Sequence, residues 1–277
     1  MPLYICPTPI GNLEDVTLRV LRILKECDFI FAEDTRRTKI LLDKYDIKGK
    51  RLYSYNKVNW KKRIPLLRKF LSEGKSVSIV SDAGTPGISD TGAEAIKLCI
   101  EEGFKVEVLP GPTAFVPALL LSGLTPHPFL FFGFLPSQRS KRRKVLDFLK
   151  ELPFTLVFYE SPHRVYESLC DILEVLGDRK ASLVREISKI HEETIRGRVS
   201  EILKKTEEVK GEIVIVVAGK EEVEEGEEGK NVEEKIRSLL EEGLSPRDIV
   251  KKLREELKLS KKSLYKLVLD LKGGDKS

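Results

Sequence analysis

The chain has 277 residues, of which 41% are hydrophobic, and it carries a net charge of +5 at pH 7. This length suits one large domain or two modest ones with an appendage, and the hydrophobic content excludes wholesale disorder. Because no apolar run reaches the roughly 18 residues of a membrane span and no signal peptide precedes the first strand, we expect a cytoplasmic protein without a membrane contact.

Apolar runs of strand length alternate with helical patterns through the first part of the chain. Strands are expected at 3–6, 29–32, 77–80 and 106–109. Helices are expected at 15–26, 36–44, 61–72 and 92–101. This alternation predicts a parallel α/β domain, which we place at residues 1–115.

A second alternation follows, and an apolar helix at 115–121 introduces it. Its strands are expected at 129–134, 155–159, 181–184 and 213–218. Its helices are expected at 140–150, 164–176 and 199–205. We therefore expect a second α/β domain at 116–220, with a cleft between the two domains that loops from both would line.

The end of the chain differs in composition from the rest. Residues 221–230 include six glutamates, which is typical of a solvated linker. Short helices are expected beyond it at 232–242, 246–256 and 261–271. Because residues 245–277 hold ten Lys or Arg against five Asp or Glu, we interpret 231–277 as a helical module that contacts nucleic acid or a second copy of the chain.

Four loops rich in glycine or proline follow expected strands, at 7–12, 81–92, 110–114 and 133–136. The 81–92 loop is the most informative, with three glycines, a proline and two aspartates in twelve residues. Each loop alone is ordinary turn chemistry. Four of them after strands of an α/β pattern indicate a ligand site, because open sheets bind ligands at the carboxyl ends of their strands.

Several common α/β enzymes are excluded by the motifs that the sequence lacks. It contains no Gly-x-Gly, no phosphate-binding P-loop and no Gly-x-Ser-x-Gly elbow. The four cysteines and three histidines show no metal-ligand spacing, so we expect free thiols and no metal site.

Seven segments, in order along the chain, resemble the tetrapyrrole methylase superfamily of S-adenosylmethionine (SAM)-dependent methyltransferases, and most closely its ribosomal RNA small subunit methyltransferase I branch. They are Thr8-Pro9-Ile10-Gly11-Asn12-Leu13, Ala32-Glu33-Asp34-Thr35-Arg36-Arg37-Thr38, Ser81-Asp82-Ala83-Gly84-Thr85-Pro86, Pro110-Gly111-Pro112, Gly133-Phe134-Leu135-Pro136, Tyr159-Glu160-Ser161-Pro162-His163-Arg164 and Lys210-Gly211-Glu212. Relatives that methylate tetrapyrroles usually carry Gly-x-Gly-Pro-Gly at the first strand. The Thr-Pro-Ile-Gly-Asn found here favours the RNA branch.

The resemblance implies a homodimer of two-domain α/β subunits with SAM in the interdomain cleft. It implies in-line 2′-O-methylation of a cytidine in the decoding region of 16S rRNA, with the small ribosomal subunit as partner. Two alternatives stay open: a methyltransferase for a corrin or porphyrin precursor, and a noncatalytic RNA-binding assembly factor.

Three sets of site residues follow as hypotheses. The cofactor would be held by Ile10, Asp82, Ala83, Gly84, Thr85, Pro86, Thr113, Ala114, Phe134 and Tyr159. The candidates for a general base are Asp34, Glu160, Glu33 and His163, although carboxylates that are simply paired with arginines would fit equally well. Clustered cations suit RNA phosphates, and solvated helix faces are the alternative; these cations are Arg36, Arg37, Arg139, Lys141, Arg142, Arg143 and Lys144.

Overall fold

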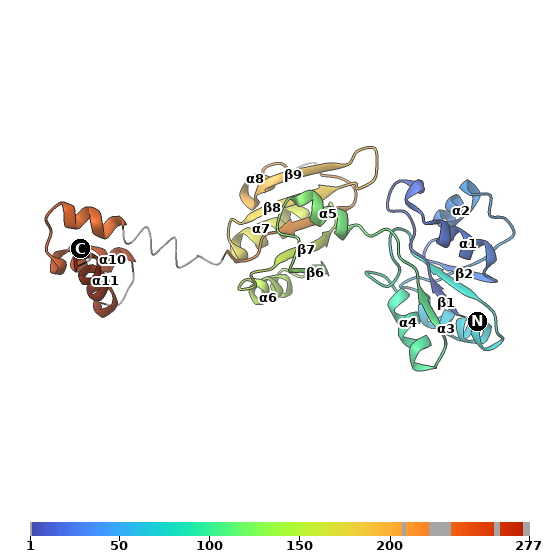
Figure 1. Ribbon diagram of the computed structural model, residues 1–277. Helices are drawn as coiled ribbons and strands as arrows, with labels where there is room; N and C mark the ends of the chain where they lie inside the picture. Colours follow the sequence, from blue (N-terminus) through green and yellow to red (C-terminus); the bar gives the residue numbers. More distant parts are fainter. Residues whose placement is uncertain (1, 207–208, 222–233, 258–260, 274–277) are drawn as a thin grey trace. The chain divides into compact units, whose positions relative to one another are not determined.

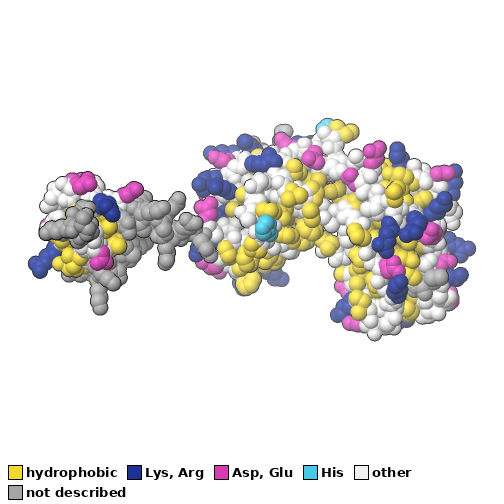
Figure 2. All heavy atoms as spheres, viewed as in Figure 1, with side chains coloured by type: hydrophobic (Ala, Val, Ile, Leu, Met, Phe, Trp, Pro, Cys, Tyr) yellow, Lys and Arg dark blue, Asp and Glu magenta, His cyan; other side chains and the backbone are white. Residues whose placement is uncertain are grey.

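The computed structural model describes all residues except 1, 207–208, 222–233, 258–260 and 274–277 (Figure 1). The chain divides into two compact units, Met1–Lys220 (unit 1) and Glu221–Ser277 (unit 2). On the face of unit 1 that Figure 2 shows, cationic and acidic side chains are interspersed. No described helix is both long enough and apolar enough to cross a membrane.

The first sheet of unit 1 is entirely parallel, with strand order β3-β2-β4-β1-β5. Its strands are β1 (Leu3–Ile5), β2 (Phe29–Ala32), β3 (Arg51–Ser54), β4 (Val77–Val80) and β5 (Val106–Val108). All four residues of the central strand β4 are buried, as expected where helices cover both faces of a parallel sheet. The carboxyl ends of all five strands therefore share one edge.

Four helices cover this sheet: α1 (Leu18–Glu26), α2 (Thr35–Lys44), α3 (Trp60–Ser72) and α4 (Gly92–Glu101). The Thr17 hydroxyl accepts a hydrogen bond from the Val20 amide and so caps α1. One core cluster joins side chains of α1 and α2 to Ile30, and a separate cluster joins α3 and α4 to Phe31. Ile30 and Phe31 pack into different clusters because the side chains of successive strand residues point to opposite faces of the sheet.

The second sheet is mixed, with order β6-β7-β10-β8-β9. Its strands are β6 (Phe129–Phe134), β7 (Thr155–Glu160), β8 (Lys180–Arg185), β9 (Glu193–Arg198) and β10 (Ile213–Val217). Only β6 and β7 pair in parallel; β10 is antiparallel to β7 and β8, and β9 to β8. A short connection turns β8 directly back into β9, which makes this pair antiparallel.

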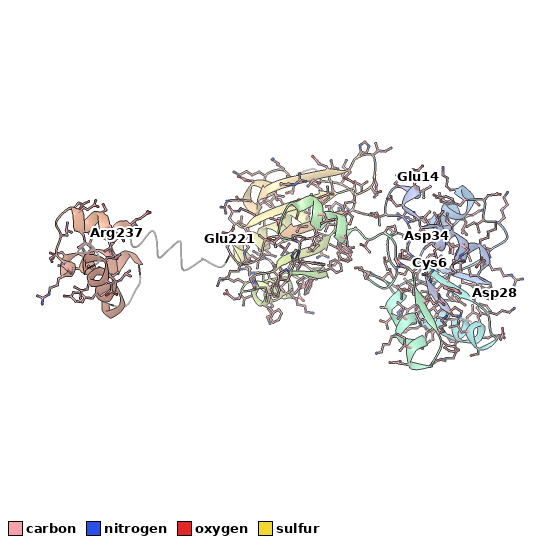
Figure 3. The ribbon with its side chains drawn as sticks, in the orientation of Figure 1. Cys6, Glu14, Asp28, Asp34, Glu221 and Arg237 are labelled. Atoms are coloured by element: carbon pink, nitrogen blue, oxygen red, sulfur yellow. The ribbon has the colours of Figure 1, made fainter. Side chains whose placement is uncertain are left out.

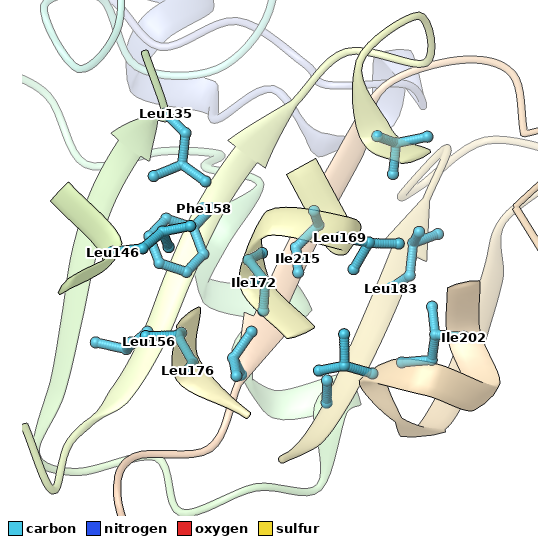
Figure 4. Close-up of a cluster of buried hydrophobic side chains, with 14 of the residues drawn as sticks. Leu135, Leu146, Leu156, Phe158, Leu169, Ile172, Leu176, Leu183, Ile202 and Ile215 are labelled. Atoms are coloured by element: carbon cyan, nitrogen blue, oxygen red, sulfur yellow. The ribbon is translucent and has the colours of Figure 1, made fainter. Parts of the chain in front are cut away.

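The helices of this half are α5 (Phe115–Ser122), α6 (Arg139–Leu149), α7 (Val165–Leu176) and α8 (Val199–Leu203). The last three bury one core with the sheet, in which Leu146, Phe158 and Ile202 lie (Figure 4). Helix α5 joins another cluster that includes Ile10 from the loop after β1. The α/β class with a C-terminal helical part is confirmed, while β3 and β9 are strands that the sequence did not predict.

Unit 2 is helical where it is described. Helical residues at 234–241 precede α10 (Pro246–Leu257) and α11 (Lys261–Gly273). Its core consists of Ile236, Leu239, Ile249, Val250, Leu253, Leu264 and Val268. The acidic segment expected as a linker lies outside the described residues, apart from Glu221.

Candidate functional site

Three of the glycine- and proline-rich loops are bonded to one another at the carboxyl edge of the first sheet. Thr8 and Gly84 exchange two backbone hydrogen bonds of 2.9 Å, and the Thr85 hydroxyl donates to the Pro112 carbonyl at 3.0 Å. Gly84 has φ +79°, a conformation that favours glycine, and a Cβ there would lie 3.5 Å from both Ile10 and Pro112. The loops after β1, β4 and β5 therefore form one braced wall.

This wall borders a cavity of about 340 Å³ within unit 1. Residues from both sheets line it: Ile10, Glu33, Asp82, Ala83, Gly84, Thr85, Ile88, Ser89, Asp90, Thr113, Ala114, Phe134, Tyr159, Glu160, Ser161, Pro162, Ile187, Gly211, Glu212, Ile213 and Val214. Of the predicted cofactor residues, only Pro86 is missing from this lining. Of the four candidate bases, Glu33 and Glu160 line it, whereas Asp34 and His163 do not.

The cavity is acidic and partly apolar. Its lining includes five acidic residues and no lysine or arginine; the acids are Glu33, Asp82, Asp90, Glu160 and Glu212, of which Glu160 has a fully buried side chain. Apolar and aromatic side chains complete the walls. Phe134 is 50% exposed and meets the Tyr159 ring edge-on, with ring centroids 5.6 Å apart. Since Phe134 is not core-packed, its ring is accessible to a ligand.

Glu33 and Asp82 connect the ends of the neighbouring strands β2 and β4. The Asp82 amide donates to Glu33 Oε2 at 3.1 Å, and the Asp34 amide donates to Asp82 Oδ1 at 2.9 Å. Burial raises the pKa of Glu33, the Asp82 hydrogen bond opposes this, and the nearby charges of Asp82 and Asp90 add to the rise. Glu33 is therefore a cavity carboxylate that binds a proton more readily than an ordinary glutamate.

Asp34 has a different role. Its carboxylate caps α2 by accepting from the Arg36 amide at 2.8 Å, and it also accepts from the Arg36 guanidinium at 2.6 Å. These hydrogen bonds, with the charge of Arg36, lower the pKa of Asp34 to about 2. The Asp34 carboxylate is therefore bound to Arg36, and Asp34 is not among the residues that line the cavity.

Glu160 ends β7 with its carboxylate fully engaged. It accepts from the Ser161 amide at 2.8 Å, from the Ser168 hydroxyl at 2.5 Å and from Arg164 Nη2 at 3.3 Å. Arg164 also donates to the Leu135 carbonyl at 2.6 Å. Glu160 thus connects the loops that follow β6 and β7 through Arg164.

The basic run at the start of α6 is largely bound to α7. The Arg142 side chain is 1% exposed and pairs at 2.7 Å with Asp171, which is equally buried. Arg139 pairs with Asp171 at 3.0 Å, and Arg143 with Glu174. The prediction of Arg142 as an RNA contact is wrong, because it is buried; Lys141 and Lys144 remain exposed.

Some lining residues escaped the sequence analysis. Asp90 lies in the 81–92 loop, and its Oδ1 accepts from the Gly87 amide at 2.9 Å and the Gly92 amide at 2.6 Å. No site role was predicted for it from the sequence, yet it lines the cavity. Ile187 follows β8 and Ile213 begins β10, and no local pattern marks either as a site residue.

Comparison with known proteins shows which family the chain resembles. A sequence model described as Tetrapyrrole (Corrin/Porphyrin) Methylases matches residues 2–203. Ribosomal RNA small subunit methyltransferase I of Thermotoga maritima is 50% identical over 221 residues, which cover 79% of this chain and 99% of that protein. The Bacillus subtilis protein of the same name is 41% identical over 270 residues, or 95% of this chain and 92% of that one.

A solved structure shares the fold. Uroporphyrin-III C-methyl transferase from Thermus thermophilus, complexed with S-adenyl homocysteine, aligns with a TM-score of 0.55 at 23% identity, covering 79% of this chain and 97% of that one. The chain therefore belongs to the tetrapyrrole methylase family and, within it, to the group of ribosomal RNA small subunit methyltransferase I proteins.

Proposed function

We propose that this protein transfers the methyl group of SAM to the ribose 2′-oxygen of a cytidine in the decoding region of 16S rRNA. The observation that carries the proposal is the acidic cavity, in a chain whose relatives at 50% and 41% identity are named as small subunit rRNA methyltransferases. Acidic residues repel the phosphates of RNA, so the RNA substrate does not explain the acidic lining of the cavity. A cationic methyl donor does explain it.

The residues present fit SAM. Its sulfonium and ammonium groups are cations, and the carboxylates of Glu33, Asp82 and Asp90 surround the cavity without an intervening lysine or arginine in its lining. The exposed Phe134 ring and Tyr159 offer aromatic faces for a cation or for adenine. When bound, SAM supplies an activated methyl group.

The protein's own contribution is to orient the acceptor and to take its proton. The braced loops after β1, β4 and β5 fix one wall of the cavity, and Glu160 fixes the loops of the opposite sheet. Such fixed geometry favours an in-line displacement, because alignment lowers the entropic part of the barrier. Glu33 accepts the proton of the 2′-hydroxyl: its raised pKa makes it a stronger base than an ordinary glutamate.

Glu33 also has an oxygen for this role. Its Oε2 accepts from the Asp82 amide, whereas no hydrogen bond to Oε1 occurs among the described residues. Asp34 and Glu160 are fully engaged with arginine and serine partners, and exposed His163 lies outside the lining. Glu33 is therefore our choice of general base.

The assignments outside the cavity are part of the same proposal. Arg36, Arg37, Lys141 and Lys144 would bind RNA phosphates, and a homodimer would act on the small subunit in the cytoplasm. Unit 2 would be an accessory RNA- or dimer-contacting module. The Thermotoga relative supports an accessory role, since 99% of it aligns over 221 residues, about the length of Met1–Lys220.

A methyl-transfer assay tests the function. Purified protein is incubated with methyl-labelled SAM and unmethylated small subunits, naked 16S rRNA or uroporphyrinogen-type acceptors. We expect label in 2′-O-methylcytidine from digested rRNA, and much slower labelling by the matched variant Glu33→Gln. Label only in a tetrapyrrole would assign the alternative methyltransferase activity, and no label in any acceptor would assign a noncatalytic role.

A further inference from the structure

The segments that follow β2 and β3 are brought together only by the fold. These strands are neighbours in the parallel sheet, paired from Phe29↔Arg51 to Ala32↔Ser54. The chain therefore leaves both at the same edge, beside the cavity. The Tyr55 amide donates to the Ala32 carbonyl at 2.7 Å, and Asn56 Nδ2 to the carbonyl of the cavity residue Glu33 at 3.5 Å.

Both segments are cationic and free of acids. Residues 35–40 contain Arg36, Arg37 and Lys39, and residues 55–63 contain Lys57, Lys61, Lys62 and Arg63. The 55–63 segment was not singled out from the sequence, and it has no glycine- or proline-rich loop beside it. Its place beside the 35–40 segment makes one cationic rim, which we call the β2–β3 rim.

The tip of the β2–β3 rim is rigid and exposed. Asn56 and Asn59 bond to each other, and both amide groups donate to the Ser54 hydroxyl, at 3.3 and 2.8 Å. The Val58 amide donates to Asn56 Oδ1 at 3.1 Å. Val58 is nevertheless 93% exposed. A braced loop that displays an apolar tip is preorganised for a partner, since little conformational entropy is left to lose on binding.

The charge distribution around the cavity indicates what this partner is. An RNA strand whose nucleotide enters the cavity must carry its flanking phosphates over the cavity's edge. The lining includes no cation, and the arginines of α6 are bound to Asp171 and Glu174. In contrast, the Arg37 side chain is 61% exposed, and its Nε lies 3.9 Å from Asp82 Oδ2. Lys57 is also exposed.

We propose that the β2–β3 rim is the surface that grips the substrate RNA strand beside the cavity. Lys57, Lys61 and Arg37 contact phosphates, and Val58 packs against a ribose or base. This inference rests on the proposed function, because the strand it binds is the one that enters the cavity for methylation. It adds Lys57, Val58 and Lys61 to the RNA-contacting residues.

The test measures how the variants bind unmethylated small subunits across a range of salt concentrations. Lys57→Gln should lower the slope of log affinity against log salt by about one, and Arg37→Gln with Lys57→Gln and Lys61→Gln by about three, since each cation displaces about one counterion. Val58→Ser should weaken binding about tenfold without changing the slope. Affinity for SAM, measured by calorimetry, should not change in Lys57→Gln or Val58→Ser.

Two control variants match these changes at the opposite end of the sheet. Lys105→Gln removes an exposed cation just before β5, and Ile100→Ser removes an apolar side chain that is 64% exposed in the last turn of α4. Both should bind subunits as the wild type does. If the wild type methylates rRNA but the rim variants bind like these controls, the inference is overturned while the proposed function stands. If the wild type methylates no RNA, the proposed function fails and the inference with it.

Discussion

The two sheets of unit 1 use the same kind of charged pattern in opposite ways. In each, an arginine in a helix forms an ion pair with an aspartate. In the first sheet, Asp34, which Figure 3 labels, forms an ion pair with Arg36, and 24% and 88% of their side chains are exposed. In the second, Arg142 and Asp171 are each 1% exposed and join α6 to α7. Burial therefore decides whether a cation is available to a ligand or is part of the core.

The same contrast separates the two cavity glutamates. Among the described residues, Glu33 Oε1 accepts no hydrogen bond, and the charges of Asp82 and Asp90 lie near this side chain. The Glu160 carboxylate instead accepts hydrogen bonds from three donors. A carboxylate that is compensated by donors orders its surroundings. One that is held among like charges is available for proton transfer.

The largest effect is expected on stability, when the buried ion pair between Arg142 and Asp171 is broken. Asp171→Ala leaves the Arg142 guanidinium buried without its partner, which should lower the free energy of unfolding by about 3–5 kcal/mol. Urea denaturation followed by circular dichroism measures this loss. Replacing both residues, Arg142→Met with Asp171→Leu, should restore most of the stability; a similar loss in the double variant would contradict a role based on charge pairing.

The second prediction concerns turnover. Glu33→Gln should lower kcat about 100-fold, the scale of general-base catalysis, with little change in the affinity for SAM. Because only ionised Glu33 accepts a proton, wild-type kcat should fall as pH falls through the raised pKa, which lies above the ordinary value of 4.5. The pH profile of single-turnover methyl transfer checks this, and an unchanged acidic limb in Glu33→Gln would remove Glu33 as the base.

A smaller effect is expected at the second cavity glutamate. Glu160→Gln keeps the shape of the side chain but removes the charge that binds Arg164 and Ser168, so stability should fall by about 2 kcal/mol. Because Glu160 positions the loops without taking a proton, the pH profile should keep its acidic limb. Loss of that limb in Glu160→Gln, with retention in Glu33→Gln, would exchange the two roles.

The smallest effect concerns the exposed cations of α6. Lys141→Gln with Lys144→Gln should leave the unfolding midpoint unchanged, because neither side chain is buried. It should reduce the salt dependence of RNA binding by about two counterions. Filter binding to small subunits at several salt concentrations provides the measurement, and an unchanged slope would assign both lysines to ordinary solvated surface.

Local sequence patterns were sufficient to predict the central strands and the loops that form the cavity. Apolar runs such as 77–80 and 213–218 predicted the central strands, since a strand buried on both faces is mostly apolar; Ser78 is the polar exception. The glycine- and proline-rich loops at 7–12, 81–92, 110–114 and 133–136 predicted a ligand site, and most of the predicted cofactor residues line the cavity. Backbone conformation and burial leave such traces in local sequence.

Only the tertiary structure decided which charges are free. Arg142 and Lys141 are neighbours in one basic run, yet the former is buried against Asp171 and the latter is exposed. Lys57 became part of a cationic rim because β2 and β3 pair in parallel, a contact that neither strand's sequence encodes alone. The availability of a charge depends on what packs against it, and for long-range pairs that is set by the fold.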